Sequence, residues 1–269
     1  MFDWNVHLPC RSDSLSQRWN DERTMTADEL LHCFNMYIQA ARTLVTNANF
    51  MIFNETLDYV QVSKFCSGIR QLLPDANVTM LIDFSVSSPS EYIQRLMESG
   101  VNAVTLHSYF QKITVDQYSN VLGLAKAAAS LNMPILIDSS YGSTNMYLYN
   151  NLSLAASILR EITDVPVVLM HSGGARAMEA FLLADACPNV FLDTSFSVPY
   201  YMDSTIEKDL AFAYKRIGVE RVLFGSDFPY ISFEDALSKT RLFFERNGFS
   251  DSEIEIVFSN TPQKVFRRL

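Results

Sequence analysis

The stretch Pro166–Gly174 reads PVVLMHSGG and joins a short apolar run to a titratable residue and two glycines. Its first part, Pro166–His171, is almost continuously apolar, which is the pattern of a parallel strand buried on both faces. The proline stands at the start of the run, where the loss of its amide donor is tolerated. The stretch therefore predicts a buried parallel strand that ends in His171.

Similar short runs recur along the chain and are separated by longer amphipathic stretches. The other predicted strands are Phe2–His7, Asn49–Asn54, Val78–Phe84, Ala103–His107, Pro134–Asp138, Val190–Asp193 and Val222–Ser226. Eight repeats of strand and helix joined by short loops favour an α/β fold, a closed (β/α)8 TIM barrel formed by residues 1–269 as a single domain. An open doubly wound sheet is the alternative, but no glycine-rich turn follows the first strand.

The stretches between the strands carry helix-start signals and apolar residues at helical spacing. Thr26–Glu29 opens the first helix with a cap residue and early acids, and Ser88–Glu91 opens another. Further helices are expected at Val115–Leu131, Asn151–Ile162, Ala175–Ala186, Ser204–Ile217 and Phe233–Asn247. In the long first connection, we expect Leu8–Met25 to form a loop over the mouth of the barrel.

Composition and charge narrow the class of protein. Of 269 residues, 48% are hydrophobic and 19% are charged, which suits a sizeable core. A net charge of −9 and a pI near 4.9 disfavour nucleic acid and anionic membranes as partners, because both need a basic surface. The sequence shows no C-x-x-C pair, signal peptide or membrane-spanning apolar run. We therefore expect a cytoplasmic protein that acts on a small-molecule substrate. Whether it forms a homo-oligomer is left open.

Polar residues stand at the ends of most predicted strands. They are His7, Asn54, Glu55, Asp83, His107, Asp138, His171, Asp193 and Asp227. Because catalytic groups in such barrels come from the carboxyl ends of the strands, these residues are candidates for a site. For Asp83 and Asp193 a role in holding loop amides is the alternative, and for His107 it is a structural hydrogen bond. His32, inside the first helix, is expected to be structural or exposed.

A series of segments carries recognisable motifs in a fixed order. They are Asp3–His7 (DWNVH), Leu106–Gln111 (LHSYFQ), Pro134–Ser140 (PILIDSS), Pro166–Gly174 (PVVLMHSGG), Arg221–Pro229 (RVLFGSDFP) and Asn260–Leu269 (NTPQKVFRRL). Together they resemble the amidohydrolase-related family, the branch that includes aminocarboxymuconate-semialdehyde decarboxylase. The H-x-G-G and G-S-D-x-P motifs of the sixth and eighth strands are the most specific. The resemblance covers essentially the whole chain.

The resemblance implies one divalent metal ion, Zn²⁺, Mn²⁺ or Mg²⁺, at the barrel mouth. Carried over residue by residue, it gives Asn5, His7, Asp138 and Asp227 as metal ligands, and His171 as the acid/base group. Asn5 and Asp138 stand where the family normally has histidine. The resulting donor set is rich in oxygen and leans towards Mn²⁺ or Mg²⁺. Candidate substrate contacts are His107, Tyr109 and Gln111.

The expected activity is that of a hydrolase, or a carbon–carbon lyase, acting on a small organic acid, lactone or amide, with His171 and Asp227 as catalytic residues. The altered ligands leave three alternatives open. The chain has a modified mononuclear metal site, or it is a metal-independent lactonase-type hydrolase in which Asp227 activates water, or it is a non-catalytic barrel that binds a small metabolite. What distinguishes catalysis from binding is whether Asp138 and Asp227 converge with His7 or are held by loop amides and arginines.

Overall fold

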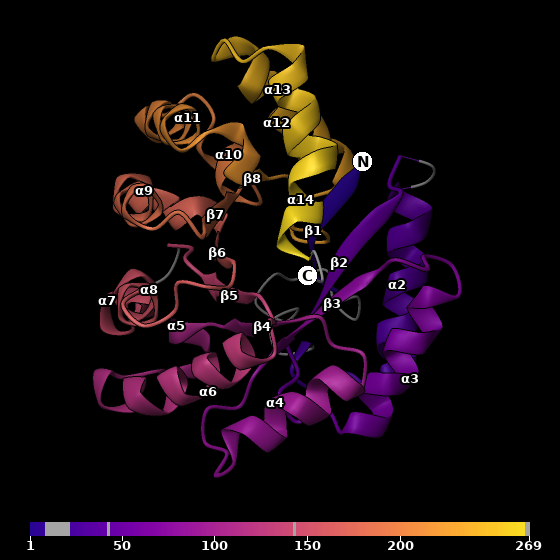
Figure 1. The fold of residues 1–269 in the computed structure, drawn as a ribbon. Coiled ribbons are helices and arrows are strands. Elements are labelled where there is room, and N and C mark those ends of the chain that lie inside the picture. Colours follow the sequence, from indigo (N-terminus) through magenta and orange to yellow (C-terminus); the bar gives the residue numbers. More distant parts are fainter. Residues whose placement is uncertain (9–21, 42–43, 142–143, 267–269) are drawn as a thin grey trace.

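The computed structural model describes residues 1–8, 22–41, 44–141 and 144–266. Eight parallel strands follow one another in the order β1 to β8. They are β1 (Phe2–Val6), β2 (Asn47–Ile52), β3 (Asn77–Leu81), β4 (Ala103–Leu106), β5 (Ile135–Asp138), β6 (Val167–Met170), β7 (Val190–Asp193) and β8 (Val222–Leu223). Figure 1 shows the helices as a ring around these strands. The predicted (β/α)8 barrel is therefore confirmed, although several strands are shorter than predicted.

Several helices of the ring begin at capping residues. The ring contains α2 (Ala27–Ala41), α3 (Tyr59–Arg70), α4 (Pro89–Glu98), α5 (Ser108–Gln111), α6 (Tyr118–Ser130), α7 (Asn145–Leu148), α8 (Asn151–Leu159), α9 (Ala177–Ala186), α10 (Ser197–Tyr201), α11 (Thr205–Ile217), α12 (Phe233–Arg246), α13 (Asp251–Glu255) and α14 (Thr261–Val265). Before α2, the Thr26 amide and hydroxyl donate to Glu29 while the Glu29 amide donates back to Thr26, which confirms the predicted capping box. His32 in α2 is exposed, as expected. No helix within the described ranges is long and apolar enough to cross a membrane.

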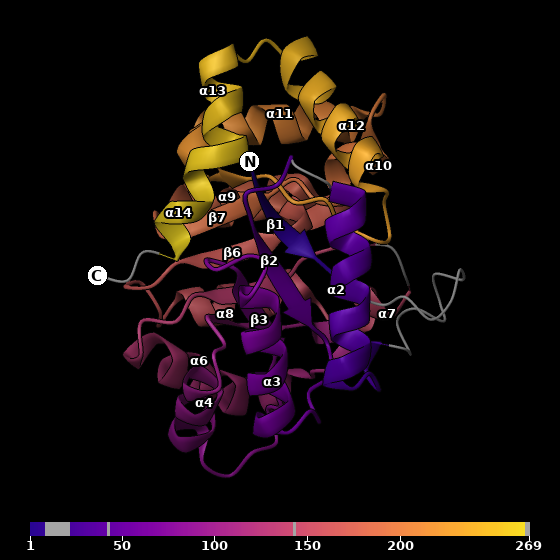
Figure 2. The same ribbon diagram turned by 90° about the vertical axis from the view of Figure 1, so that its right-hand side faces the viewer.

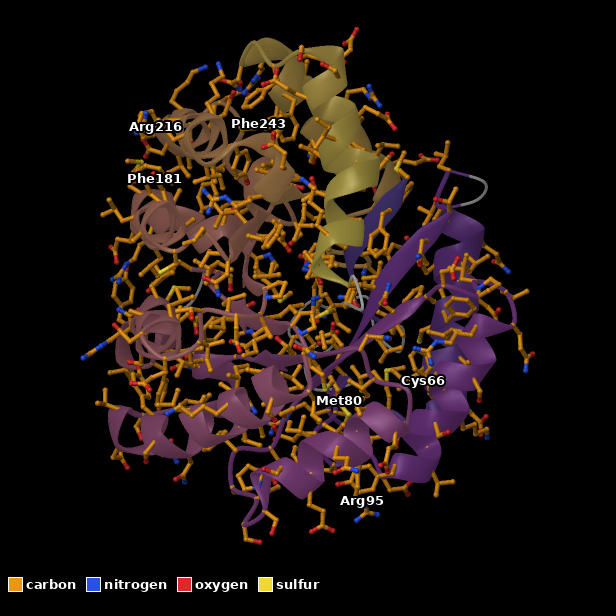
Figure 3. The ribbon with its side chains drawn as sticks, viewed as in Figure 1. Cys66, Met80, Arg95, Phe181, Arg216 and Phe243 are labelled. Atoms are coloured by element: carbon orange, nitrogen blue, oxygen red, sulfur yellow. The ribbon has the colours of Figure 1, made fainter. Side chains whose placement is uncertain are left out.

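Apolar side chains form two buried layers, one on each face of the strands. Phe50 and Ile52 of β2 belong to the layer shared with the helices, whereas their neighbours Met51 and Phe53 belong to a second cluster. This alternation places the second cluster inside the barrel. In Figure 3, the labelled Arg216 points outward from α11, away from the strands. The buried strands therefore have apolar residues at most positions, which is the pattern that predicted them from the sequence.

The barrel closes between β1 and β8 through individual hydrogen bonds. The Trp4 amide donates to the Phe224 carbonyl at 2.8 Å, and the Asp227 amide donates to the Asn5 carbonyl at 2.9 Å. The pairing of β1 with β2 also changes register between Asp3 and Val6. Such an irregularity re-aims side chains, and here Trp4 joins the inner cluster while Asn5 also faces inward. This seam carries the residues predicted as the first and last metal ligands.

Aromatic rings cover the amino end of the barrel. Phe266, which follows α14, lies with its ring centroid 4.9 Å from that of Trp4 and 6.4 Å from that of Phe2. In Figure 2, α14 lies at one end of the barrel, and the arrows of β1 and β2 point towards the other. The polar strand ends therefore gather at the end away from this aromatic cover. Most of the predicted mouth loop, residues 9–21, lies outside the described residues.

Candidate active site

Three histidines and two aspartates meet at the carboxyl ends of the strands. They are His7 after β1, His107 after β4, Asp138 at the end of β5, His171 after β6 and Asp227 after β8. Each is at most 6% exposed. The charge on His171 interacts with both Asp138 and Asp227, and it also interacts with His7. The predicted residues therefore face one shared space.

Asp138 is held by imidazoles on one oxygen and by its own loop on the other. Its Oδ2 lies 3.1 Å from Nε2 of His171 and 3.3 Å from Nε2 of His107. Its Oδ1 accepts hydrogen bonds from the amide and hydroxyl of Ser140 and from Nδ2 of Asn151. Burial works to raise the pKa of Asp138, but the two imidazoles and these donors hold that pKa well below its usual range. Asp138 is therefore a carboxylate at neutral pH.

The His171 imidazole faces acceptors on both sides. Its Nδ1 lies 3.1 Å from the Ser195 carbonyl oxygen, and its Nε2 faces Asp138. Burial would lower the pKa of His171, but the neighbouring Asp138 carboxylate outweighs it and raises the pKa to about 10. His171 also has a φ of 61°, and its amide donates to Asp193 at 2.7 Å. The site therefore holds a protonated imidazole in a fixed orientation.

His107 differs from His171 in the direction of its pKa shift, although both rings contact the same carboxylate oxygen. Burial dominates at His107 and lowers its pKa to about 4 against the opposing pull of Asp138, so the ring is neutral at pH 7. The ring of Tyr109 meets it edge-on at 4.3 Å, and the Tyr109 hydroxyl shares a hydrogen bond with Ser140. Gln111 accepts from the His107 amide and donates to Glu55 and to the Ile82 carbonyl. A substrate contact for His107, Tyr109 or Gln111 stays a prediction.

His7 lies between two carboxylates. Its Nδ1 is 2.8 Å from Oε1 of Glu22 and its Nε2 is 3.6 Å from Oδ1 of Asp227. Burial would lower the pKa of His7, but Glu22 outweighs it and raises that pKa. The ring stacks on Phe53 with centroids 4.9 Å apart, and Tyr230 covers it edge-on. Glu22 is a site residue that the sequence analysis missed.

Asn5 and Asp227 meet at the seam between β1 and β8. Asn5 Nδ2 donates to Oγ of Ser195 at 2.9 Å and to Oδ1 of Asp227 at 3.3 Å. A side chain on Gly225 would come within 2.9 Å of the Cβ of Asn5 and 3.0 Å of that of Ser195, so glycine is needed there. The glycine of the G-S-D-x-P motif thus makes room for the Asn5–Ser195 contact.

The remaining strand-end acids have structural partners. Asp83 accepts from the amide and hydroxyl of Ser85, and Asp193 accepts from Ser195 and from the His171 amide. Asp3 accepts from the Ser226 amide and the Tyr37 hydroxyl, and burial raises its pKa to about 6. The loop-holding alternative considered for Asp83 and Asp193 is therefore the one seen in the structure.

The sequence matches an established enzyme family. A family model described as Amidohydrolase matches residues 76–268, which is well over half of the chain. The chain belongs to the amidohydrolase family. No curated protein gives a significant match.

Solved structures resemble this amidohydrolase over nearly its whole length. An uncharacterised TIM-barrel protein from Bordetella bronchiseptica has a TM-score of 0.72 at 15% identity and covers 98% of this chain and 97% of its own. A probable 2-pyrone-4,6-dicarboxylic acid hydrolase from Acinetobacter baumannii has a TM-score of 0.67 at 13% identity, with 98% of each chain covered. 5-Carboxyvanillate decarboxylase from Sphingomonas paucimobilis has a TM-score of 0.66 at 11% identity, covering 100% and 99%. At such identities the likeness shows the fold alone.

Members of this family generally use a divalent metal ion, so the predicted ligands can be tested for fit. The structure brings Asn5, His7 and Asp227 together, whereas Asp138 contacts His107 and His171. Asn5 turns its amide nitrogen to Asp227, while its Oδ1, the atom that could bind a metal ion, is buried and accepts no hydrogen bond from the described residues. Within the described part of the chain, no three His, Cys, Asp or Glu side chains are arranged to hold a metal ion. In this arrangement the donor set does not fit the predicted centre.

Proposed function

We propose that this amidohydrolase is a hydrolase that cleaves a lactone or amide of a small organic acid with its own side chains at the barrel mouth. The observation that carries the proposal is the position of Asp227 beside the His7 imidazole, 3.6 Å from its Nε2, where its charge also interacts with the His171 imidazole. This arrangement offers a base beside two imidazoles that can donate. Such a combination suits the addition of water to a carbonyl group.

The first step is general-base catalysis. Asp227 takes a proton from a water molecule, and the oxygen of that water adds to the carbonyl carbon of the substrate. The carbonyl π electrons move to the carbonyl oxygen, which becomes an oxyanion. The Nε2–H group of His7 donates to that oxygen, and the positive charge of the His171 imidazole, which stays paired with Asp138, also stabilises the oxyanion. Because both rings are already held by Glu22 and Ser195, little reorganisation is needed.

The second step returns the proton. The oxyanion re-forms the carbonyl and the bond to the leaving oxygen or nitrogen breaks. The protonated Asp227 gives its proton to that atom, so that an alcohol or amine leaves and Asp227 is again a carboxylate. Asp138 keeps the His171 imidazole protonated throughout, since its Oδ2 lies 3.1 Å from Nε2. The cycle is balanced without a co-reactant other than water.

The proposal is tested by a substrate screen with the purified full chain. Lactones, amides and carboxylated aromatic acids are incubated with the protein, and acid release and CO2 release are recorded separately. We expect acid release from a lactone or amide. CO2 release without hydrolysis would indicate a carbon–carbon lyase instead, and tight binding without turnover would indicate a metabolite-binding barrel. Either result would overturn the hydrolase assignment.

The role of Asp227 is tested with a matched pair of variants. Asp227→Asn keeps the size of the side chain but removes the base, and turnover should fall by about 10²-fold or more. Asp83→Asn makes the same chemical change at another strand end. Among the contacts described, the only hydrogen-bond partner of the Asp83 side chain is Ser85. Full activity in Asp227→Asn, or equal losses in both variants, would contradict the mechanism.

A further inference from the structure

The Ser195 hydroxyl joins three groups of the site. It lies 2.7 Å from Oδ1 of Asp193, 2.9 Å from Nδ2 of Asn5 and 3.0 Å from Nδ1 of His171. Ser195 is fully buried and follows the end of β7. No motif of the sequence analysis includes it. The hydroxyl therefore links β1, β6 and β7 directly beneath the proposed reacting groups.

The direction of these hydrogen bonds follows from counting protons. A hydroxyl has one proton to donate and two lone pairs to accept with. A carboxylate such as Asp193 can only accept, so the Ser195 proton is donated to it. Asn5 Nδ2 carries two protons and can only donate. The lone pairs of the Ser195 hydroxyl therefore accept one hydrogen bond from Nδ2 of Asn5 and one from Nδ1–H of His171.

A second contact requires the same state of His171. The backbone carbonyl of Ser195 is an acceptor only, and it lies 3.1 Å from the same Nδ1. Two acceptors of Ser195 thus face one nitrogen, which must carry a proton. The ring is thereby turned so that Nε2 points to Asp138, 3.1 Å away, and to the shared space of the site.

Asp193 fixes Ser195 in turn. Its Oδ1 accepts from the Ser195 amide at 3.1 Å, from the Ser195 hydroxyl and from the His171 amide at 2.7 Å. Oδ1 of Asp193 therefore holds both Ser195, which orients the imidazole, and the backbone amide of His171, which carries the ring. Because His171 has a positive φ, this backbone contact also supports a conformation that is uncommon for a residue other than glycine.

We infer that Ser195, held by Asp193, is a positioning residue that fixes the ring orientation and the Nδ1–H state of His171 and directs its Nε2 to Asp138 at the reacting groups. The inference rests on the proposed function for the role of His171. The orientation itself is a property of the resting protein and does not depend on turnover. It can therefore be tested before any substrate is known.

The test uses the small number of histidines in the chain. The sequence contains four, so long-range ¹H–¹⁵N correlation spectra of the labelled full chain resolve each ring, with exposed His32 as an internal reference. We expect the wild type to show His171 with a slowly exchanging Nδ1–H. In Ser195→Ala the ¹⁵Nδ1 resonance should shift, and exchange of that proton should become about 10-fold faster.

Ser197→Ala is the matched control. The Ser197 hydroxyl donates to the His171 carbonyl at 2.5 Å, so this variant removes a contact of the same residue without touching its ring. Its ring signals should stay at the wild-type positions. Unchanged ring signals in Ser195→Ala, or equal changes in both variants, would overturn the inference.

Two further measurements test the role of Ser195, one if the variant does not fold and one if a substrate is found. If Ser195→Ala does not fold, the wild-type spectrum decides alone, because a His171 ring with a bare Nδ1 contradicts the inference outright. If the screen yields a substrate, Ser195→Ala should lower kcat by about 10²-fold with little change in KM. An unchanged kcat would overturn the positioning role. Failure to find any substrate would count against the proposed hydrolase while the ring spectra still test Ser195.

Discussion

The ends of β5 and β8 differ from the ends of β3 and β7, although all four carry an aspartate. Asp138 and Asp227 face imidazoles across the mouth of the barrel. Asp83 and Asp193 accept hydrogen bonds from residues of their own loops, as Asp138 does from Ser140, but no imidazole nitrogen is paired with either of their carboxylates among the described contacts. All four aspartates thus share a position near the carboxyl end of a strand. The partner in space, which is contributed by another strand, decides which of them faces the reacting groups.

The largest expected effect comes from converting the site to the usual family pattern. Asn5→His with Asp138→His places imidazoles at both positions where the family has them, while His7 and Asp227 remain. We expect the double variant to retain near-stoichiometric Zn²⁺ or Mn²⁺ after dialysis, and the wild type only traces, as measured by elemental mass spectrometry. Adding Asp227→Asn should release the metal again. Near-stoichiometric metal in the wild type would mean that the strand-end aspartates act as ligands after all.

The next effect concerns the charge of Asp138. Asp138→Asn leaves the buried, protonated His171 without its carboxylate, and breaking such a pair costs about 3 kcal/mol of unfolding free energy. Urea unfolding at pH 7 measures the loss. A change below about 0.5 kcal/mol would show that the imidazoles do not depend on this carboxylate.

A pH-dependent effect distinguishes Asp193 from the exposed acids. Burial raises its folded-state pKa to about 6, despite the opposing charge of His171, from an ordinary value of 3.8. Because the folded protein binds this proton more tightly, stability from Asp193 is fully present below about pH 4 and is lost as pH rises to about 6. The loss amounts to about 3 kcal/mol. Asp193→Asn should remove this part of the pH dependence, as measured by urea unfolding between pH 4 and 7, and an unchanged profile would contradict it.

The smallest effect is expected at β3. Asp83 is half-buried and its Oδ1 accepts from Ser85. Asparagine has an oxygen that accepts in the same way, so Asp83→Asn should change the unfolding free energy by no more than about 0.5 kcal/mol. A larger loss in thermal unfolding would mean that the carboxylate charge itself supports the β3 loop.

The fold was predictable because its signals are local. Each buried strand is an apolar run, and the capping box at Thr26 marks the start of α2. One omission was α3, although Asp58 before it accepts from the Gln61 amide and Val62, Phe65, Cys66 and Ile69 follow at helical spacing. The ends of β8 were not predictable, because Phe224 and Asp227 bond to β1 one by one instead of continuing a ladder.

The sequence predicted the site residues that belong to a motif. It did not predict the residues that only tertiary packing brings to the site. His7, Asp138, His171 and Asp227 stand in motif positions, and the structure brings them to one space. Glu22 lies in a stretch without periodicity, so nothing local indicates that it reaches His7. For Ser195 the only signal was a cluster of small polar residues after β7, which is common in any loop. Whether the predicted ligands bind a metal stays a prediction.

The aromatic cover at the amino end has a consequence for how the chain reaches its native state. Trp4 of β1 is covered by Phe266, which is far from it along the chain, so the floor of the barrel forms only when two distant segments meet. Contacts between such distant segments close slowly, because the intervening chain must first be ordered. Until that contact forms, Trp4 exposes an apolar surface to which a chaperone can bind.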